Sequence, residues 1–345
     1  MKTMSKKFLC AVSLVIGLAF ITVALPQALA EEFYAGKTIR VVVGFPPGGG
    51  YDTYTRAVAR HIGKYIPGNP TSIVQNMPGA GSLIAANHMY NKAKPEGLTV
   101  WIWNSGLVLS QALGDRKVRF DARNVDWIGA PSVGLPSCAV MGFTGLKTLT
   151  DVLNSKKVLK MGGTRAGSPT VDLPRILNKN MGTNFKVISG LRGTPGIRIA
   201  MQKREIDGSC WGWESMKVTA RSMLDAKGDD KLIPFLIQGK DNAAEVKDLP
   251  QMTNVIKGED KLAMFRAWHA TQEFMRPWSL PPGTPKDRLE ILRKAFRAAI
   301  KDPTFLAEAK KSKLLINYVS GEEIEKFVDE ILGISPAAKA MSSSW

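Results

Sequence analysis

Residues 37–52 read Lys37-Thr38-Ile39-Arg40-Val41-Val42-Val43-Gly44-Phe45-Pro46-Pro47-Gly48-Gly49-Gly50-Tyr51-Asp52. The apolar, β-branched run from Ile39 to Val43 is typical of a strand buried on both faces, as in a parallel sheet. The two prolines end this strand, and the three glycines after them leave the backbone open to a ligand. We expect Asp52 to cap the helix that follows.

The residues after Asp52 have the spacing of an amphipathic helix. Its apolar face is formed by Tyr54, Ala57, Val58, His61, Ile62 and Tyr65. A strand, a glycine loop and a helix N-terminus in this order favour an anion site, because free N–H groups and the positive end of the helix dipole converge there. A tight turn without any ligand remains an alternative.

Nucleotide-binding loops fit this stretch poorly. The dinucleotide fingerprint needs a third glycine, but Thr53 stands in its place. A phosphate loop ending at Gly36-Lys37-Thr38 would need a glycine where the chain has Glu31.

The first thirty residues have the pattern of a secretory signal peptide. Three lysines precede an apolar run from Phe8 to Leu25, and Ala28-Leu29-Ala30 is a small-residue cleavage site. We therefore expect residues 1–30 to be a signal peptide cleaved after Ala30, and the protein to be exported to the periplasm.

The processed chain would have 315 residues, which indicates about two domains. The whole chain carries a net charge of +17, and loss of the three signal lysines leaves +14. The basic residues are scattered, so we expect no nucleic acid partner but a general attraction of anions. Cys138 and Cys210 are free to form a disulfide in an oxidising compartment, or to stay reduced. The three histidines are too far apart for a metal motif, and we expect no metal and no cofactor.

Two further units of strand, loop and helix follow. A strand over 71–76 leads into the glycine loop 77–82, and a strand over 98–103 ends at Asn104-Ser105-Gly106. Three such units in succession predict an α/β protein with a parallel sheet and ligand groups at the carboxyl ends of its strands.

Several motifs in order carry a family resemblance. They are residues 37–52 with Arg56, Asn76-Met77-Pro78-Gly79-Ala80-Gly81, Pro95-Glu96-Gly97-Leu98-Thr99, Arg192-Gly193-Thr194-Pro195, Glu205-Ile206-Asp207-Gly208, Pro281-Pro282-Gly283-Thr284-Pro285 and Asp302-Pro303-x-Phe305. Together they resemble the Bug-type receptors, which are the periplasmic solute-binding proteins of tripartite tricarboxylate transporters. Glu96, Leu98, Leu191 and Arg204 depart from the family pattern.

The resemblance implies a two-lobe, type 2 periplasmic binding protein fold with a hinged cleft. Lobe one would comprise residues 31–129 and 233–345, and lobe two residues 130–232. The chain would cross between the lobes at Trp127-Ile128-Gly129 and again near Leu232-Ile233-Pro234-Phe235-Leu236. The function implied is that of a monomeric receptor, not an enzyme, that captures a small organic acid and delivers it to membrane transporter subunits.

Lobe two is expected to offer two more helix N-termini beside glycine loops. Ser168-Pro169 and Thr194-Pro195 have the pattern of an N-cap followed by a first-turn proline. Pro174 lies where the first of these helices should continue, so the helix is expected to break or restart there.

These loops predict the ligand-binding residues. From lobe one they are Pro47, Gly48, Gly49, Gly50, Tyr51, Asp52, Thr53, Asn104 and Ser105; from lobe two they are Thr164, Arg165, Gly167, Ser168, Arg192, Gly193, Thr194, Trp213 and Glu214. Backbone amides from both lobes would hold a carboxylate by charge-assisted hydrogen bonds. Arg165 and Arg192 would either pair with that carboxylate or point to solvent and to acids of lobe one.

Trp211 and Trp213 alternate, so they would share one face of an extended segment. They would form either core packing or a wall against an apolar ligand body. Glu214 would accept a hydrogen bond from a ligand amine or remain an exposed charge.

Two other functions stay open at this stage. A ligand-presenting protein for a sensor would have the same fold. An exported hydrolase-like enzyme would need a nucleophile motif such as G-x-S-x-G or S-x-x-K, and none is convincing; paired carboxylates from Asp52 and Glu214 are the remaining route. The identity of the acid is not encoded in these motifs.

Overall fold

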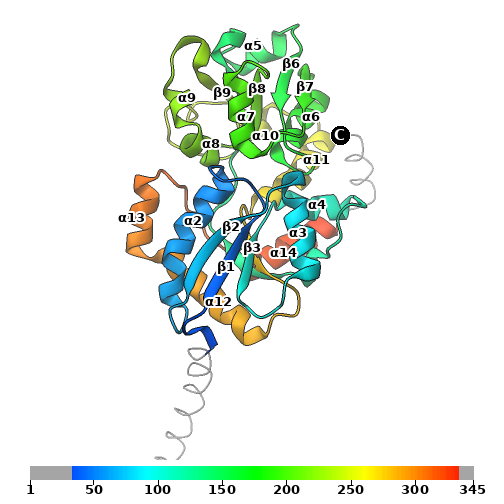
Figure 1. The fold of residues 1–345 in the computed structure, drawn as a ribbon. Coiled ribbons are helices and arrows are strands. Elements are labelled where there is room, and N and C mark those ends of the chain that lie inside the picture. Colours follow the sequence, from blue (N-terminus) through cyan, green and yellow to red (C-terminus); the bar gives the residue numbers. More distant parts are fainter. Residues whose placement is uncertain (1–32, 334–345) are drawn as a thin grey trace, which may run out of the picture.

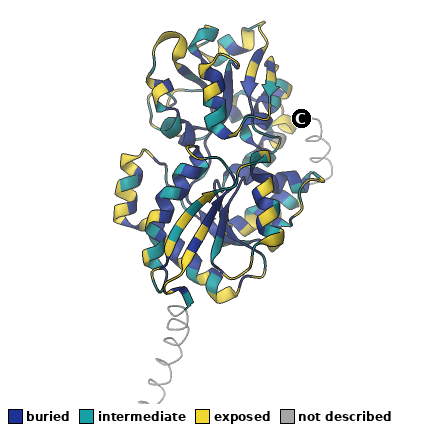
Figure 2. Cartoon of the chain, viewed as in Figure 1, coloured by how far each residue is buried: buried dark blue, intermediate teal, exposed yellow. Residues whose placement is uncertain are grey.

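The computed structural model describes residues 33–333, which form two lobes, each built around one sheet (Figure 1). The predicted signal peptide and its cleavage site lie outside the described residues. Buried residues occur throughout both lobes and in the region where the lobes meet (Figure 2). In residues 33–333, no helix is long and apolar enough to cross a membrane.

The sheet of lobe one has six strands in the order β11-β4-β10-β3-β1-β2. Their bounds are β1 Thr38–Val43, β2 Thr71–Asn76, β3 Thr99–Ile102, β4 Asp126–Ala130, β10 Trp278–Leu280 and β11 Val319–Ser320. Strands β1, β2 and β3 are parallel, which confirms the three predicted units. Strand β10 lies antiparallel between β3 and β4, so the C-terminal part of the chain returns to this sheet.

Helices cover both faces of this sheet, because successive strand residues point to opposite faces and apolar side chains are buried on each face. Val42 and Trp101 pack on one face with helices α3 (Leu83–Lys92), α4 (Gly106–Ala112) and α14 (Gly321–Leu332). Val41 and Val100 pack on the other face with α2 (Gly50–Ile62), α12 (Lys286–Lys301) and α13 (Pro303–Lys311). The predicted burial of the first strand on both faces is therefore confirmed for Val41 to Val43.

The sheet of lobe two has five strands in the order β7-β6-β8-β5-β9. They are β5 Pro136–Met141, β6 Leu159–Gly162, β7 Phe185–Ile188, β8 Gly208–Gly212 and β9 Leu232–Ile237. The helices between them are α5 Leu149–Asn154, α6 Pro169–Met181, α7 Gly193–Gln202, α8 Trp213–Thr219 and α9 Arg221–Asp225. Strands β6, β7 and β8 are parallel, whereas β5 runs antiparallel to both β8 and β9.

The strand pairing moves both predicted crossings between the lobes. Trp127, Ile128 and Gly129 lie within β4 and belong to the first sheet, so the first crossing falls in residues 131–135. Strand β9 pairs with β5 in the second sheet, so a boundary at 232/233 is wrong. We place the second crossing between Ile237 and Trp278, in the segment that holds α10 (Met252–Val255) and α11 (Glu259–His269).

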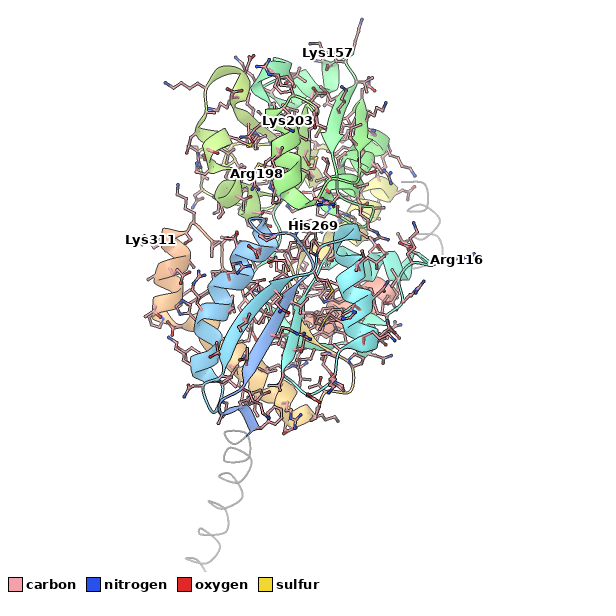
Figure 3. The ribbon with its side chains drawn as sticks, viewed as in Figure 1. Arg116, Lys157, Arg198, Lys203, His269 and Lys311 are labelled. Carbon is pink, nitrogen blue, oxygen red and sulfur yellow. A yellow bond between two sulfur atoms is a disulfide. The ribbon has the colours of Figure 1, made fainter. Side chains whose placement is uncertain are left out.

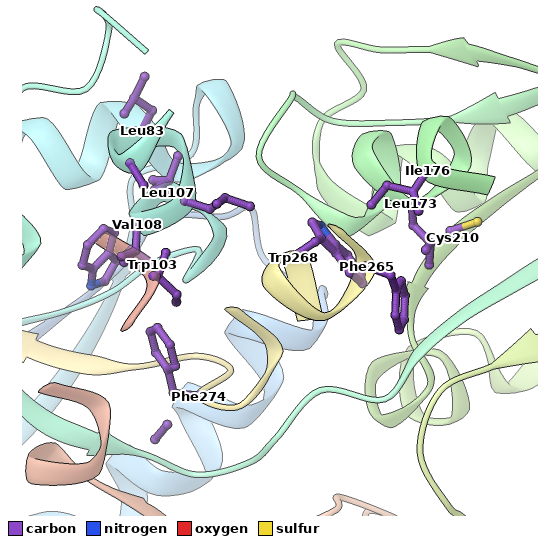
Figure 4. Close-up of a cluster of buried hydrophobic side chains, with 14 of the residues drawn as sticks. Leu83, Trp103, Leu107, Val108, Leu173, Ile176, Cys210, Phe265, Trp268 and Phe274 are labelled. Atoms are coloured by element: carbon purple, nitrogen blue, oxygen red, sulfur yellow. The ribbon is translucent and has the colours of Figure 1, made fainter. Parts of the chain in front are cut away.

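One hydrophobic cluster joins the two lobes through α11. Phe265 and Trp268 on this helix lie between Leu173 of lobe two and Phe274 at the start of the return to lobe one (Figure 4). Short 3₁₀ turns complete the chain at Gly63–Tyr65, Ala80–Ser82, Ala122–Asn124, Gly142–Thr144, Gly228–Asp230 and Ala270–Gln272.

Cys138 and Cys210 form a disulfide, which settles the question that the sequence left open. They are directly opposite each other on β5 and β8. The bridge closes a loop with a sequence separation of 72 residues, and loops of this size gain stability when they are cross-linked.

We predict that replacing both cysteines (Cys138→Ala with Cys210→Ala) lowers the free energy of unfolding by about 2–5 kcal/mol, because the unfolded chain regains the freedom of that loop. Denaturant unfolding measures the change. Wild-type protein kept in a reducing agent should lose stability to a similar extent, and the double variant should not respond to the reductant. Equal stability of the oxidised wild type and the double variant would contradict the assignment.

Candidate functional site: a pocket between the lobes

A cavity of about 60 Å³ lies where loops from the two lobes meet. It has room for a few water molecules or a small organic molecule. Its lining comprises Phe45, Pro46, Gly49, Gly50, Tyr51, Asn104, Thr164, Ser168, Pro169, Thr170, Gly193, Thr194, Pro195, Trp211, Ser215, Met275 and Arg276.

Three helices point their N-termini into this pocket. Helix α2 begins at Gly50, α6 at Pro169 and α7 at Gly193, and all three residues line the cavity. The first N–H groups of a helix have no acceptor within the helix, and its dipole places partial positive charge at this end. The pocket is therefore suited to an anion.

Helix α2 begins earlier than expected, and Asp52 is not its cap. Gly49 is the N-cap, with an extended backbone, and Asp52 lies in the first turn. The Asp52 carboxylate accepts hydrogen bonds from the Gly48 N–H (3.0 Å), Arg56 Nε (2.9 Å) and Asn76 Nδ2 (3.0 Å). Asp52 thus holds the glycine loop in place and does not line the pocket. Thr53 is engaged in the same turn, where its hydroxyl donates to the Gly49 carbonyl at 3.0 Å.

The helix starts of lobe two match the predictions in part. Ser168 is the N-cap of α6 with Pro169 in the first turn, as expected, but its hydroxyl bonds to those of Thr164 and Thr170 (2.8 and 2.6 Å). The expected break at Pro174 is wrong, because α6 continues through it to Met181.

Helix α7 also differs from the prediction. It begins at Gly193 with Arg192 as its N-cap, so Thr194-Pro195 lie inside the first turn and are not the cap pair.

Three direct contacts connect the two lobes close to the pocket. Arg165 forms an ion pair with Asp115 of lobe one, so one of its two expected roles, pairing with a lobe-one acid, is observed. Asn104 Nδ2 donates to the Gly167 carbonyl at 2.7 Å. Arg198 Nη2 donates to the Gly48 carbonyl at 3.2 Å.

Arg192 lies close to the pocket as well. Its side chain is exposed beside a larger outer cavity of about 510 Å³.

Arg276 lines the pocket and belongs to a buried ion pair with Glu214, which is not itself a lining residue; we call this pair the floor of the pocket. Glu214 Oε1 accepts a hydrogen bond from Arg276 Nη2 at 2.8 Å, and both side chains are almost completely buried. Glu214 Oε2 accepts the Leu135 N–H at 2.9 Å, and Arg276 Nη1 donates to Ser132 Oγ at 2.9 Å. Glu214 is thus neither exposed nor free for a ligand amine, and it does not meet Asp52.

The surroundings keep the Arg276 guanidinium charged. It lies over the Tyr54 ring, 4.2 Å from the centroid. Burial is the largest single influence and would lower the pKa of Arg276, but the Glu214 carboxylate together with Tyr54 and Tyr51 raises that pKa above the ordinary value. Burial also raises the pKa of Tyr51 and Tyr54, so both phenols stay protonated.

The two tryptophans do not share a face. Trp211 is the fourth residue of β8 and lines the pocket. The strand ends at Gly212, so Trp213 is the first residue of α8 and packs in the core of lobe two. The predicted shared face is therefore wrong: Trp211 lines this pocket, and Trp213 is not among its lining residues.

Four buried polar atoms on the pocket lining have no hydrogen-bond partner within residues 33–333. They are the Tyr51 hydroxyl, Trp211 Nε1, Ser215 Oγ and Arg276 Nε. Leaving such a group unpaired costs roughly 1–3 kcal/mol. Four of them around one cavity indicate that a polar ligand or water completes the site.

Eight predicted site residues line the pocket: Gly49, Gly50, Tyr51, Asn104, Thr164, Ser168, Gly193 and Thr194. Pro47 and Gly48 are exposed, and Ser105 is buried with its hydroxyl 3.5 Å from Met275 Sδ. Sequence reasoning missed Arg276. The signal for it was a charged residue inside the otherwise apolar run Phe274-Met275-Arg276-Pro277-Trp278.

Asp172 lies behind the loop that carries Gly167. Its carboxylate accepts the Gly167 N–H at 3.0 Å. Burial raises the pKa of Asp172 to about 7, and the Gly167 hydrogen bond opposes this only in part. In residues 33–333, no three His, Cys, Asp or Glu side chains lie close enough together to hold a metal ion.

Comparisons with known proteins connect this geometry to a group of binding proteins. No family model matches the chain. Protein BugT of Bordetella pertussis is 31% identical over 99 residues, which is 29% of this chain and 29% of BugT. The chain thus matches less than a third of this curated relative's length.

Solved structures extend the similarity over the whole fold. The periplasmic binding protein BugD has a TM-score of 0.71 at 18% identity, covering 90% of this chain and 98% of BugD. MatC from Rhodopseudomonas palustris, solved with bound malate, has a TM-score of 0.69 at 18% identity, covering 89% and 99%. The predicted resemblance to Bug-type periplasmic binding proteins and the predicted two-lobe α/β fold are confirmed.

We predict that Arg276→Met destabilises the protein by about 3–5 kcal/mol, because it leaves the Glu214 carboxylate buried without an opposite charge. Denaturant unfolding measures the loss. The double variant Glu214→Gln with Arg276→Met removes both charges and should recover part of it. An Arg276→Met protein as stable as wild type would show that the ion pair does not stabilise the folded protein.

Proposed function

We propose that this chain, a protein resembling the Bug-type binding proteins, is a periplasmic receptor that captures a small organic carboxylate between its lobes. The observation that carries the proposal is the convergence of the α2, α6 and α7 N-termini on one cavity, whose lining includes buried donors without a partner in the described chain. Backbone amides from both lobes clamp the carboxylate, since they supply hydrogen bonds without bringing a further charge into the pocket.

Delivery is part of the proposal. The pattern of residues 1–30 supports export to the periplasm. The likeness to BugD and to MatC, which holds malate, supports a role in binding rather than catalysis. In this role the loaded receptor passes its acid to membrane subunits of a tripartite tricarboxylate transporter.

The net positive charge of the chain supports the capture of anions. Charged side chains are spread over both lobes, with Arg116, Lys157 and Lys311 at their outer edges (Figure 3). A positive surface of this kind raises the encounter rate with small acids at low ionic strength.

Ligand capture works through closure of the lobes. The pocket lining includes Gly49 and Gly50 from lobe one and Thr194 from lobe two, so neither lobe forms the site alone. An acid that contacts both sets of amides favours the conformation in which the loops meet, because only that conformation offers both.

A thermal-shift screen against mono-, di- and tricarboxylic, amino and aromatic acids tests the proposal. Binding to the native state alone stabilises it by roughly 2.7 kcal/mol at about 100 times Kd. We expect at least one acid class to raise Tm in a concentration-dependent manner. A chain whose Tm responds to no acid would contradict carboxylate capture.

We further predict that Gly49→Val abolishes acid binding while the protein stays folded. A Cβ on Gly49 would lie 3.2 Å from Thr194 Oγ1 and 3.4 Å from Pro195 Cδ, so the extra methyl groups of valine would hold the lobes apart. Calorimetry with the acid found in the screen measures the loss.

Gly196→Val is the matched control, because a Cβ there meets only ordinary contacts at 3.6 Å or more. It should bind the acid like wild type. Full affinity in Gly49→Val would place the ligand elsewhere.

A further inference from the structure

The charges and the shape of the pocket indicate which class of organic acid it binds. We propose that the pocket selects an acid with a single carboxylate and a compact apolar body, and that Arg276, held by Glu214, determines this selection. The inference rests on the proposed function and names the substrate class of the same site.

The charges around the pocket match a single carboxylate. In the described part of the chain, Arg276 is the one lining residue with a full positive charge, and Glu214 lies against it at 2.8 Å. The pair is neutral as a unit. What remains is the partial charge of three helix N-termini, about half a unit each.

One carboxylate is therefore matched within the pocket. A second carboxylate would lose its water while facing only the small remainder of positive charge and the neutral donors of Tyr51 and Trp211. Neutral donors do not balance a full negative charge, and an uncompensated buried charge is strongly unfavourable. This disfavours acids with two or three carboxylates.

The walls of the pocket are largely apolar and enclose a small volume. Phe45 and Tyr51 stack with ring centroids 4.2 Å apart, and Trp211 and Met275 also line the cavity. Prolines 46, 169 and 195 complete the apolar surface. A cavity of about 60 Å³ with such walls suits a short, apolar ligand body.

Donors gather at one end of the pocket, beside Gly50. An atom added at the Cβ position of Gly50 would lie 2.2 Å from Ser215 Oγ and 3.1 Å from Arg276 Nη2. The Ser215 hydroxyl and the guanidinium thus converge on the first residue of α2, where the helix N–H groups are free. Ser215 Oγ and Arg276 Nε both lack partners in residues 33–333, and the two side chains are 5% and 1% exposed. One carboxylate would satisfy this group of donors.

Calorimetry with matched pairs of acids tests the selection on wild-type protein purified from the periplasm of the expressing cell. The pairs are butanoate and succinate, pentanoate and glutarate, and benzoate and terephthalate. Each pair shares its carbon skeleton and differs in one carboxylate. For the skeleton that binds, we expect the monocarboxylate to bind at least tenfold more tightly than its partner.

Two outcomes separate this inference from the function it rests on. Equal or tighter binding of the dicarboxylate overturns the single-carboxylate selection and leaves a carboxylate receptor standing. If none of these acids, nor any in the wider screen, binds, the proposed function fails as well.

Glu214→Gln tests the role of the ion pair. It removes the negative charge and leaves the floor with a net positive charge, so the preference for the monocarboxylate should fall at least tenfold. Glu330→Gln makes the same change in charge on the exposed face of α14, and its preference should equal that of wild type. An unchanged preference in a folded Glu214→Gln protein overturns the assignment.

Ser215→Ala tests the place of the carboxylate with little risk to folding, because the hydroxyl has no partner within the described chain. The affinity for the best acid should fall about tenfold. Ser222→Ala, an exposed serine on α9, is the control and should bind like wild type. Full affinity in Ser215→Ala would overturn this placement.

Discussion

The buried ion pair between Glu214 and Arg276 is the interaction on which the arrangement of the lobes depends. Glu214 also accepts the Leu135 N–H, and Arg276 also donates to Ser132 Oγ, so both crossing segments are fixed to the same two side chains. Two opposite charges this deeply buried are stable only together. The start of lobe two and the return to lobe one are therefore held at one point, and that point is the floor of the pocket.

The sequence predicted the parallel strands and the glycine loops because their signals are local, as in the run Ile39 to Val43. It failed where a neighbour in space decides the outcome. The role of Asp52 depends on Arg56 and Asn76, which draw its carboxylate into the loop. The importance of Arg276 depends on Glu214, 62 positions away, and no spacing rule connects the two.

A single lobe cannot form the pocket. The amides that line it belong to helices of both lobes, and the loops of the two lobes must be in close contact to enclose it. Gly49 permits that contact because any larger side chain would meet Thr194 and Pro195. Outside the pocket, Phe265 and Trp268 of α11 pack between the lobes and connect their hydrophobic cores (Figure 4). The glycine loops thus let the two lobes come close together at the pocket, and the aromatic residues of α11 pack the lobes against each other.

We propose above all that one carboxylate lies at the N-terminus of α2, beside the Glu214–Arg276 pair. A crystal structure of the protein grown with an acid that raises its Tm tests this most directly. We expect carboxylate oxygens about 3 Å from the Gly50 or Tyr51 N–H and from Ser215 Oγ. An acid bound instead in the outer cavity beside Arg192, with the inner pocket filled by water, would contradict it.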